Sequence, residues 1–189
     1  GVVIVADKRI TNPLIVSSSL EKVYPIDSHI GLATSGLVAD GRKLVDESRV
    51  EAQRNRILFN EPVRVTSLVK FICDLLQLYT QYGGIRPFGV SLLIAGQDDV
   101  GLRLFETDPS GTPTEWKATA LGEGRAEIMD FLEKSYASNM NLQDSVILAL
   151  KALKKAIKKK LEADKVEIGI VEKNKFTKLS VDECQKYVN

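Results

Sequence analysis

The stretch GVVIVADKR, residues 1–9, decides the fold, because it opens on an apolar run of branched side chains that ends at Asp7. A short run of this kind, bounded by a charged residue, is typical of a strand. Alternate side chains of a strand point to opposite faces, and both sets are apolar here. We therefore expect residues 2–6 to form a strand that is buried on both faces and paired with a neighbouring strand.

The rest of the chain alternates between groups of strands and pairs of helices. Apolar runs and turn residues predict strands over 30–33 and 90–95, a hairpin over 102–121 and a last hairpin over 166–179. Helical periodicity predicts helices over 37–57, 67–83 and 124–136, and one that begins at Asn141 with Asp144 as its capping partner. A sheet that is buried on both faces needs a layer on each side. We therefore expect a single domain over 1–189, a four-layer αββα sandwich of two antiparallel sheets flanked by helix pairs.

Periodicity also predicts which side of each helix faces the core. The first helix carries a stripe of small and apolar residues, made of Leu37, Gly41, Leu44, Val45, Ser48 and Ala52. The third helix carries a similar set, made of Ile128, Met129, Leu132 and Tyr136. We expect both stripes to be buried.

Composition excludes several classes of function. The chain has 26 Lys and Arg residues against 25 Asp and Glu, a net charge of +1, so no overall field attracts it to nucleic acid or to an anionic membrane. Its apolar runs are shorter than the roughly 18 residues that a membrane span requires. Cys73 and Cys184 have neither metal-ligand nor redox spacing, and His29 is the only histidine, so we expect no metal, no cofactor and a reducing cytoplasmic compartment.

Two motifs have a structural and a functional interpretation. Lys151, Lys154, Lys155 and Lys158 share one helical face, which is either a solvated surface or a ridge that binds phosphate or an acidic partner. The stretch GEGRAE, residues 122–127, places glycines before a helix, as phosphate loops do, but it lacks the rest of either nucleotide-binding motif. A tight turn is the simpler interpretation of the second motif.

Lys22 stands out in the stretch SLEKVYPID, residues 19–27. In a regular strand its side chain would share a face with Leu20, Tyr24 and Ile26. A lysine among apolar neighbours either extends to the edge of the sheet or lines a pocket where its ammonium meets an anion. The pattern leaves both interpretations open. A second candidate is YTQYGGIRPFG, residues 79–89, whose tyrosines and paired glycines suggest a contact loop after a helix end.

Several stretches in this order, namely GVVIVADKR, EKVYPID, HIGLATSGLVADGRKLVDESRVEAQ, YTQYGGIRPFGVSLLIAG and LFETDPSGT, resemble the proteasome subunit family, specifically its archaeal-type alpha subunits. The resemblance implies the αββα fold shared with N-terminal-nucleophile hydrolases. It also implies that an N-terminal helix, a gate tail and the first strands precede Gly1 in the family.

The resemblance is compatible with two kinds of subunit, alpha-type and beta-type. Beta-type subunits are threonine peptidases, and Asp7 and Lys22 match the positions of their supporting aspartate and lysine. Gly1 offers no attacking hydroxyl, and the last strand is entered through EADKVEIGI rather than through a Ser-x-Asp-Gly-like turn. We therefore expect a non-catalytic alpha subunit, with a beta-type peptidase and a free-standing binding module as alternatives.

As an alpha subunit, the chain would form a homo-heptameric outer ring that stacks on proteasome beta subunits and controls substrate entry. Regulatory ATPases of the family dock C-terminal tails of the hydrophobic-tyrosine-any type between neighbouring alpha subunits. The resemblance places Lys22, Gly36 and Leu37 in that tail-binding pocket. It places Tyr82, Gly83 and Gly84 at the gate and pore. No nucleic acid or membrane partner is expected.

Overall fold

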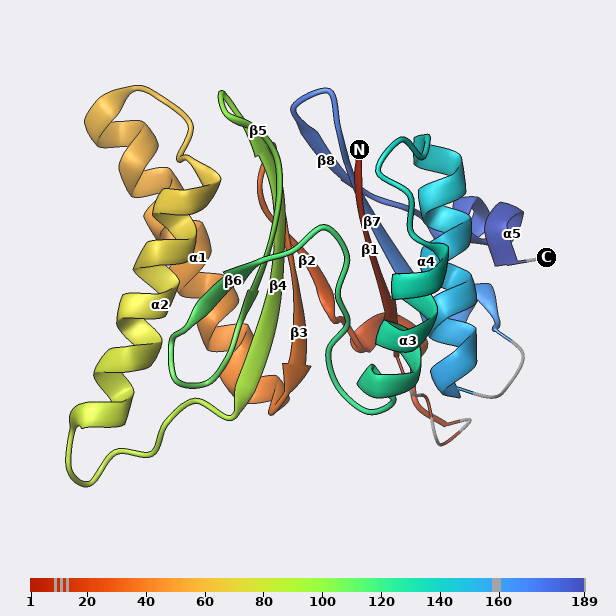
Figure 1. Cartoon of the computed structure of the whole chain (residues 1–189). Coiled ribbons are helices and arrows are strands. Elements are labelled where there is room, and N and C mark those ends of the chain that lie inside the picture. Colours follow the sequence, from red (N-terminus) through yellow and green to blue (C-terminus); the bar gives the residue numbers. More distant parts are fainter. Residues whose placement is uncertain (9, 11, 13, 158–160, 189) are drawn as a thin grey trace.

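The computed structural model describes residues 1–8, 10, 12, 14–157 and 161–188 and contains two antiparallel sheets (Figure 1). The smaller sheet has the order β1-β7-β8, formed by Val2–Asp7, Val166–Glu172 and Lys175–Lys178. The larger sheet has the order β2-β3-β4-β5-β6, formed by Val23–Asp27, Ile30–Gly36, Val90–Asp98, Gly101–Thr107 and Pro113–Glu115. This confirms the strands predicted over 2–6, 30–33 and 90–95 and the two predicted hairpins, although β6 already ends at Glu115.

Helices cover the outer face of each sheet. They are α1 (Val38–Phe59), α2 (Val65–Gln81), α3 (Arg125–Ser135), α4 (Leu142–Ile157) and α5 (Val181–Val188), with short 3₁₀ turns at Ser17–Ser19 and Ala163–Lys165. Figure 1 shows α1 and α2 against the larger sheet, and α4 and α5 against the smaller sheet with α3 packed on α4. The predicted four-layer αββα sandwich is correct. No helix of the described ranges is long and apolar enough to cross a membrane.

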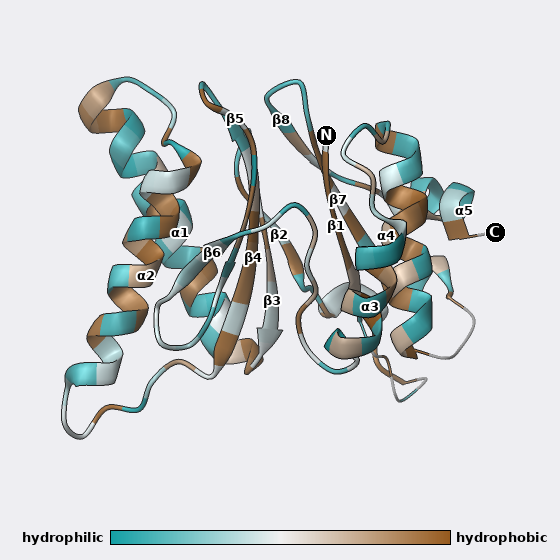
Figure 2. Cartoon of the chain, viewed as in Figure 1, coloured by the Kyte–Doolittle hydropathy of each residue, from teal (hydrophilic) through white to brown (hydrophobic). Residues whose placement is uncertain are grey.

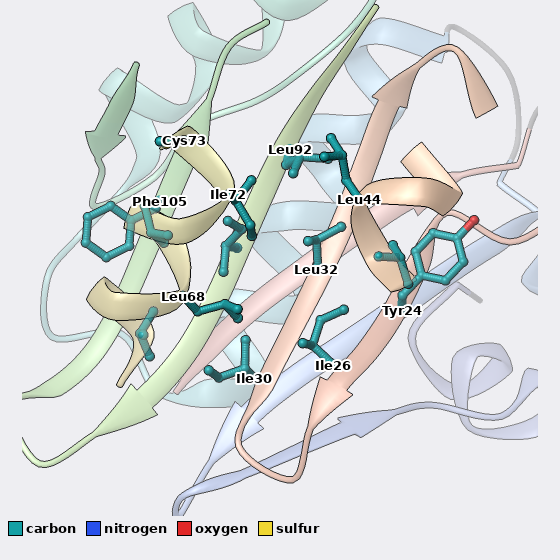
Figure 3. Close-up of a cluster of buried hydrophobic side chains, with 14 of the residues drawn as sticks. Tyr24, Ile26, Ile30, Leu32, Leu44, Leu68, Ile72, Cys73, Leu92 and Phe105 are labelled. Atoms are coloured by element: carbon teal, nitrogen blue, oxygen red, sulfur yellow. The ribbon is translucent and has the colours of Figure 1, made fainter. Parts of the chain in front are cut away.

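The core has one cluster at each of the three levels between the layers, and a fourth cluster between α3 and α4. The largest cluster lies between α1, α2 and the larger sheet, where Leu32, Leu44, Leu68 and Ile72 are fully buried (Figure 3). A second cluster lies between the two sheets, and a third between the smaller sheet and α4 and α5. Figure 2 shows the same pattern as hydrophobic bands along the strands and along the helices that face them. β1 was expected to be buried on both faces, but only Ile4 is fully buried, and Val3 and Val5 on the face toward α4 and α5 are partly buried. Apolar contacts on both faces explain its continuous apolar run.

Most residues of the predicted helical stripes are buried, but Met129 of α3 is only partly buried. Five of the six residues predicted for the stripe of α1 are buried, and so are Ile128 and Leu132 of α3. Leu37 is 51% exposed because it precedes α1 as its N-cap residue, and Tyr136 is 37% exposed because it caps the end of α3. Periodicity fails at a helix end because the backbone there leaves the helical path.

The structure corrects one strand and adds one helix. A regular strand through Leu20 and Lys22 was expected, but β2 begins only at Val23 and its register shifts between Pro25 and Asp27. The N–H of Lys22 is bound by a side chain rather than by a neighbouring strand. The helix α5 was not predicted, because eight residues give about two turns and too few repeats for a periodicity.

Candidate functional site

Lys22 lies half-buried where the chain enters β2. Its Nζ donates a hydrogen bond of 2.6 Å to the backbone carbonyl of Asp7, the last residue of β1. Its own carbonyl accepts a hydrogen bond of 3.0 Å from the Thr34 N–H of β3. The structure therefore brings Asp7 and Lys22 together at the junction of the two sheets.

A buried carboxylate holds the backbone at this point. Glu167 of β7 is 4% exposed, and its Oε2 accepts hydrogen bonds from the N–H groups of Lys22 and Val23 at 2.8 and 2.9 Å. Its Oε1 lies 2.8 Å from the Lys178 ammonium and 3.5 Å from the Lys8 ammonium. Burial raises the pKa of Glu167, but the hydrogen bonds from Lys178, Lys22 and Val23 lower that pKa below its usual value. Glu167 therefore stays ionised and fixes the backbone of Lys22.

Gly36 and Leu37 form the turn from β3 into α1. Gly36 has φ +132, and a Cβ on it would lie 2.3 Å from the carbonyl oxygen of Gly89, so a glycine is required here. The Leu37 N–H donates to that same carbonyl at 2.8 Å. Lys22 and Gly36 both line a cavity of about 920 Å³ that extends between β1, α3 and α4. Leu37 lies outside the cavity lining and is half exposed.

Tyr82, Gly83 and Gly84 lie in the connection from α2 to β4. Tyr82 caps the end of α2 and is 58% exposed. A Cβ added at Gly83 or Gly84 would meet nothing within 4 Å, and Gly84 has φ +83. This segment therefore lies in the open, and packing does not restrain it. Figure 1 shows that it runs along the same end of the molecule as the start of α1.

Sequence reasoning missed three charged residues of this region. Asp40 is a buried residue in the first turn of α1, and Arg86 pairs with it through both terminal nitrogens of its guanidinium. Glu167 is the third. In the sequence each of them looks like an ordinary surface charge. The only signal was the position of Asp40 directly after the turn of Gly36 and Leu37.

The structure also describes most of the lysine face and the GEGRAE stretch. Lys151, Lys154 and Lys155 are exposed, and the Lys155 ammonium lies 5.8 Å from the centre of the Phe131 ring. Lys158 falls outside the described residues. Gly124 has φ +79 and is the N-cap residue of α3, so GEGRAE is a tight turn before a helix. Within the part of the chain that the structure describes, no cluster of three or more His, Cys, Asp or Glu side chains could hold a metal ion.

Comparisons with known proteins agree with this architecture. A family model described as "Proteasome subunit" matches residues 1–171. The chain is 56% identical over 179 residues to the "Proteasome subunit alpha" of Methanopyrus kandleri, which covers 95% of this chain and 73% of that protein. It is 52% identical to the protein of the same name from Methanosarcina acetivorans and 50% identical to that of Methanothermobacter thermautotrophicus, each over the whole chain and 77% of the relative. The chain belongs to the proteasome subunit family.

Proposed function

We propose that the chain is a non-catalytic alpha-type subunit of the 20S proteasome core particle, built as one domain. The observation that carries this proposal is the identity of 50% to 56%, over most of the chain, to relatives that are all named proteasome subunit alpha. Such a subunit assembles with proteasome beta subunits, which carry out peptide hydrolysis. In this account the chain forms a homo-heptameric outer ring in the cytoplasm and controls which substrates enter.

The proposed docking site for regulatory tails is the activator groove, defined by Lys22, Gly36 and Leu37. A C-terminal carboxylate is a stronger acceptor for the Lys22 ammonium than a neutral carbonyl, because the hydrogen bond is then assisted by charge on both sides. The exposed Leu37 side chain, on the turn that follows Gly36, offers apolar surface for the tyrosine of the tail. Tyr82, Gly83 and Gly84 are the proposed gate and pore segment.

Lys22→Ala tests the groove. The variant is assembled with an archaeal beta subunit, and hydrolysis of a fluorogenic peptide is measured with and without a short synthetic peptide that ends in Leu-Tyr-Arg. We expect the stimulation to disappear while unstimulated hydrolysis stays at the wild-type rate, because the ammonium recognises the tail but takes no part in hydrolysis. Lys151→Ala removes an exposed lysine from α4 and serves as the matched control. Full stimulation in Lys22→Ala would refute the assignment of the groove.

A beta-type threonine peptidase was the alternative interpretation. The relatives do not favour it, since those compared above bear the alpha name.

A further inference from the structure

Asp40 joins the start of α1 to the loop that follows the proposed pore segment. Its carboxylate accepts hydrogen bonds from the Nη1 and Nη2 of Arg86 at 2.6 and 2.7 Å. It also accepts one from the backbone N–H of Gly89 at 2.8 Å. Asp40 therefore fixes two points of the residues 85–89 that lead into β4.

The same loop is held from the other side by the activator groove. The carbonyl of Gly89 accepts a hydrogen bond from the N–H of Leu37, and the N–H of Gly89 donates to Asp40. The missing side chain of Gly36 lets its backbone lie directly against Gly89. With a Cβ at Gly89, the nearest atom would be the Leu37 Cδ1 at 2.7 Å. The two segments are thus in direct backbone contact, with no room between them for a side chain.

The pair of Asp40 and Arg86 is stronger than an ordinary surface ion pair. Exposed ion pairs contribute little because water screens them, and the Arg86 side chain is 63% exposed. The Asp40 side chain, however, is only 10% exposed and accepts three N–H groups, two of them from the parallel arms of one guanidinium. The hydrogen bond from Arg86, followed by that from Gly89, lowers the pKa of Asp40 to about 2. The carboxylate is therefore charged across the physiological range.

Among the described residues, the pore segment has only a local contact of this kind, a hydrogen bond of 3.4 Å from the Ile85 N–H to the Tyr82 carbonyl. Gly83 and Gly84 have open space around them, so only the two ends of the connection can set the position of this segment. One end is the last turn of α2, and the other is the contact of Arg86 and Gly89 with Asp40. A displacement of Gly36 and Leu37 would move the first turn of α1 and, through Asp40, that second end.

We propose that Asp40, Arg86 and Gly89 form a clamp that couples the activator groove to the segment Tyr82–Gly84, with Asp40 as its positioning residue. The clamp rests on the proposed function, because it assigns a route by which a tail docked at Lys22 acts on the pore. Asp40 touches neither the tail nor the substrate. Its role is to make residues 85–89 move together with Gly36 and Leu37.

Hydrogen exchange of the chain tests the clamp without any reference to activators. In Asp40→Asn and Arg86→Gln we expect the amides of residues 82–89 to exchange faster than in the wild type, because the charged anchor is lost. Arg56→Gln is the matched control, since the Arg56 Nη2 likewise lies 2.9 and 3.0 Å from the two carboxylate oxygens of Asp27, but at the far end of α1. Unchanged exchange over residues 82–89 in both clamp variants would overturn the proposal.

A second experiment asks whether the clamp transmits the signal. The variants are assembled with a beta subunit, and binding of the peptide ending in Leu-Tyr-Arg is measured separately from its stimulation of hydrolysis. Coupling energies of this kind correspond to roughly 2- to 30-fold effects. We expect the stimulation by the peptide to decrease in Arg86→Gln by a factor within that range. The dissociation constant of the peptide should stay at the wild-type value. Arg86→Lys keeps the charge but loses the two-armed contact and should restore part of the stimulation.

The outcomes of these experiments separate the clamp from the proposed function. If the peptide fails to bind or stimulate the wild-type particle, the proposed function is wrong, and hydrogen exchange alone then decides whether the clamp exists. If stimulation persists in Arg86→Gln at the wild-type level, the clamp does not transmit the signal. If Arg86→Gln weakens peptide binding instead, Arg86 shapes the groove itself and the coupling proposal is refuted.

Discussion

Glu167 shows how a single buried carboxylate can organise a site that lies beside it. It joins residues that are far apart in the chain, because it receives N–H groups from Lys22 and Val23 and the ammonium of Lys178. Such contacts persist only when every buried donor finds an acceptor. The position of Lys22 therefore depends on a residue of the other sheet.

Removing this carboxylate should destabilise the whole chain. Glu167→Ala leaves the N–H groups of Lys22 and Val23 without their acceptor, while the Lys178 ammonium keeps Glu21 and the Val23 carbonyl. We therefore expect the free energy of unfolding to fall by about 2–5 kcal/mol in urea denaturation, since each unsatisfied buried donor costs about 1–3 kcal/mol. Glu167→Gln keeps an oxygen for the N–H groups and should lose less. Glu133→Ala on the exposed side of α3 is the control and should stay within about 0.5 kcal/mol of the wild type. Equal stability of Glu167→Ala and the control would contradict this account.

The same carboxylates predict how stability depends on pH. The hydrogen bonds of the folded state lower the pKa of Glu167 below its usual 4.5, and those from Arg86 and Gly89 lower the pKa of Asp40 from 3.8 to about 2. A lowered carboxyl pKa stabilises the fold above the pKa of the unfolded chain, and this stabilisation is lost as pH falls. We expect the free energy of unfolding to drop between about pH 4.5 and pH 2, and to drop less in Glu167→Gln. An identical drop in variant and wild type would exclude Glu167 as a contributor.

At the level of the elements, the two sheets meet around one aromatic ring. A Cβ on Gly31 of β3 would lie 1.9 Å from the Phe176 ring, and one on Gly169 of β7 would lie 2.7 Å from it. The two glycines thus form a slot for Phe176 of β8. Packed sheets leave few voids, so the ring fits only because both positions lack side chains.

Gly31→Ala tests the slot. The added methyl group overlaps the ring, and we expect a loss of about 1–3 kcal/mol in the free energy of unfolding, measured by denaturant titration. Gly83→Ala is the control, because a Cβ there meets nothing within 4 Å. Should the two variants be equally stable, the sheets must be able to shift apart without cost.

The elements also show how far the sequence alone could lead. The layers and the buried stripe of α1 were predictable, because apolar residues repeat along a strand or helix with the period of that element. The pair of Asp40 and Arg86 and the cluster around Glu167 were not, since their members lie far apart in the chain and charged residues carry no periodic signal. The late start of β2 was also missed. It depends on Glu167 of β7, a residue far away in the chain, whose side chain accepts the hydrogen bond of the Lys22 N–H. Residues named by resemblance, such as Tyr82, stay predictions until the assembled particle is tested.

For the whole molecule, the account describes a subunit that works by docking and assembly. We expect the purified chain to show no peptidase activity, and a threonine-directed epoxyketone to label only the beta subunits of the assembled particle. The reason is that the relatives compared above are named proteasome subunit alpha. Intact mass spectrometry after labelling checks this, and any adduct on the chain would revive the peptidase alternative.

The most direct test of the central claim is electron microscopy of the chain co-expressed with an archaeal proteasome beta subunit. The account predicts a four-ring barrel in which this chain forms both outer rings, each with sevenfold symmetry. Particles that carry the chain in the inner rings, or a chain that stays monomeric beside complete beta rings, would contradict it.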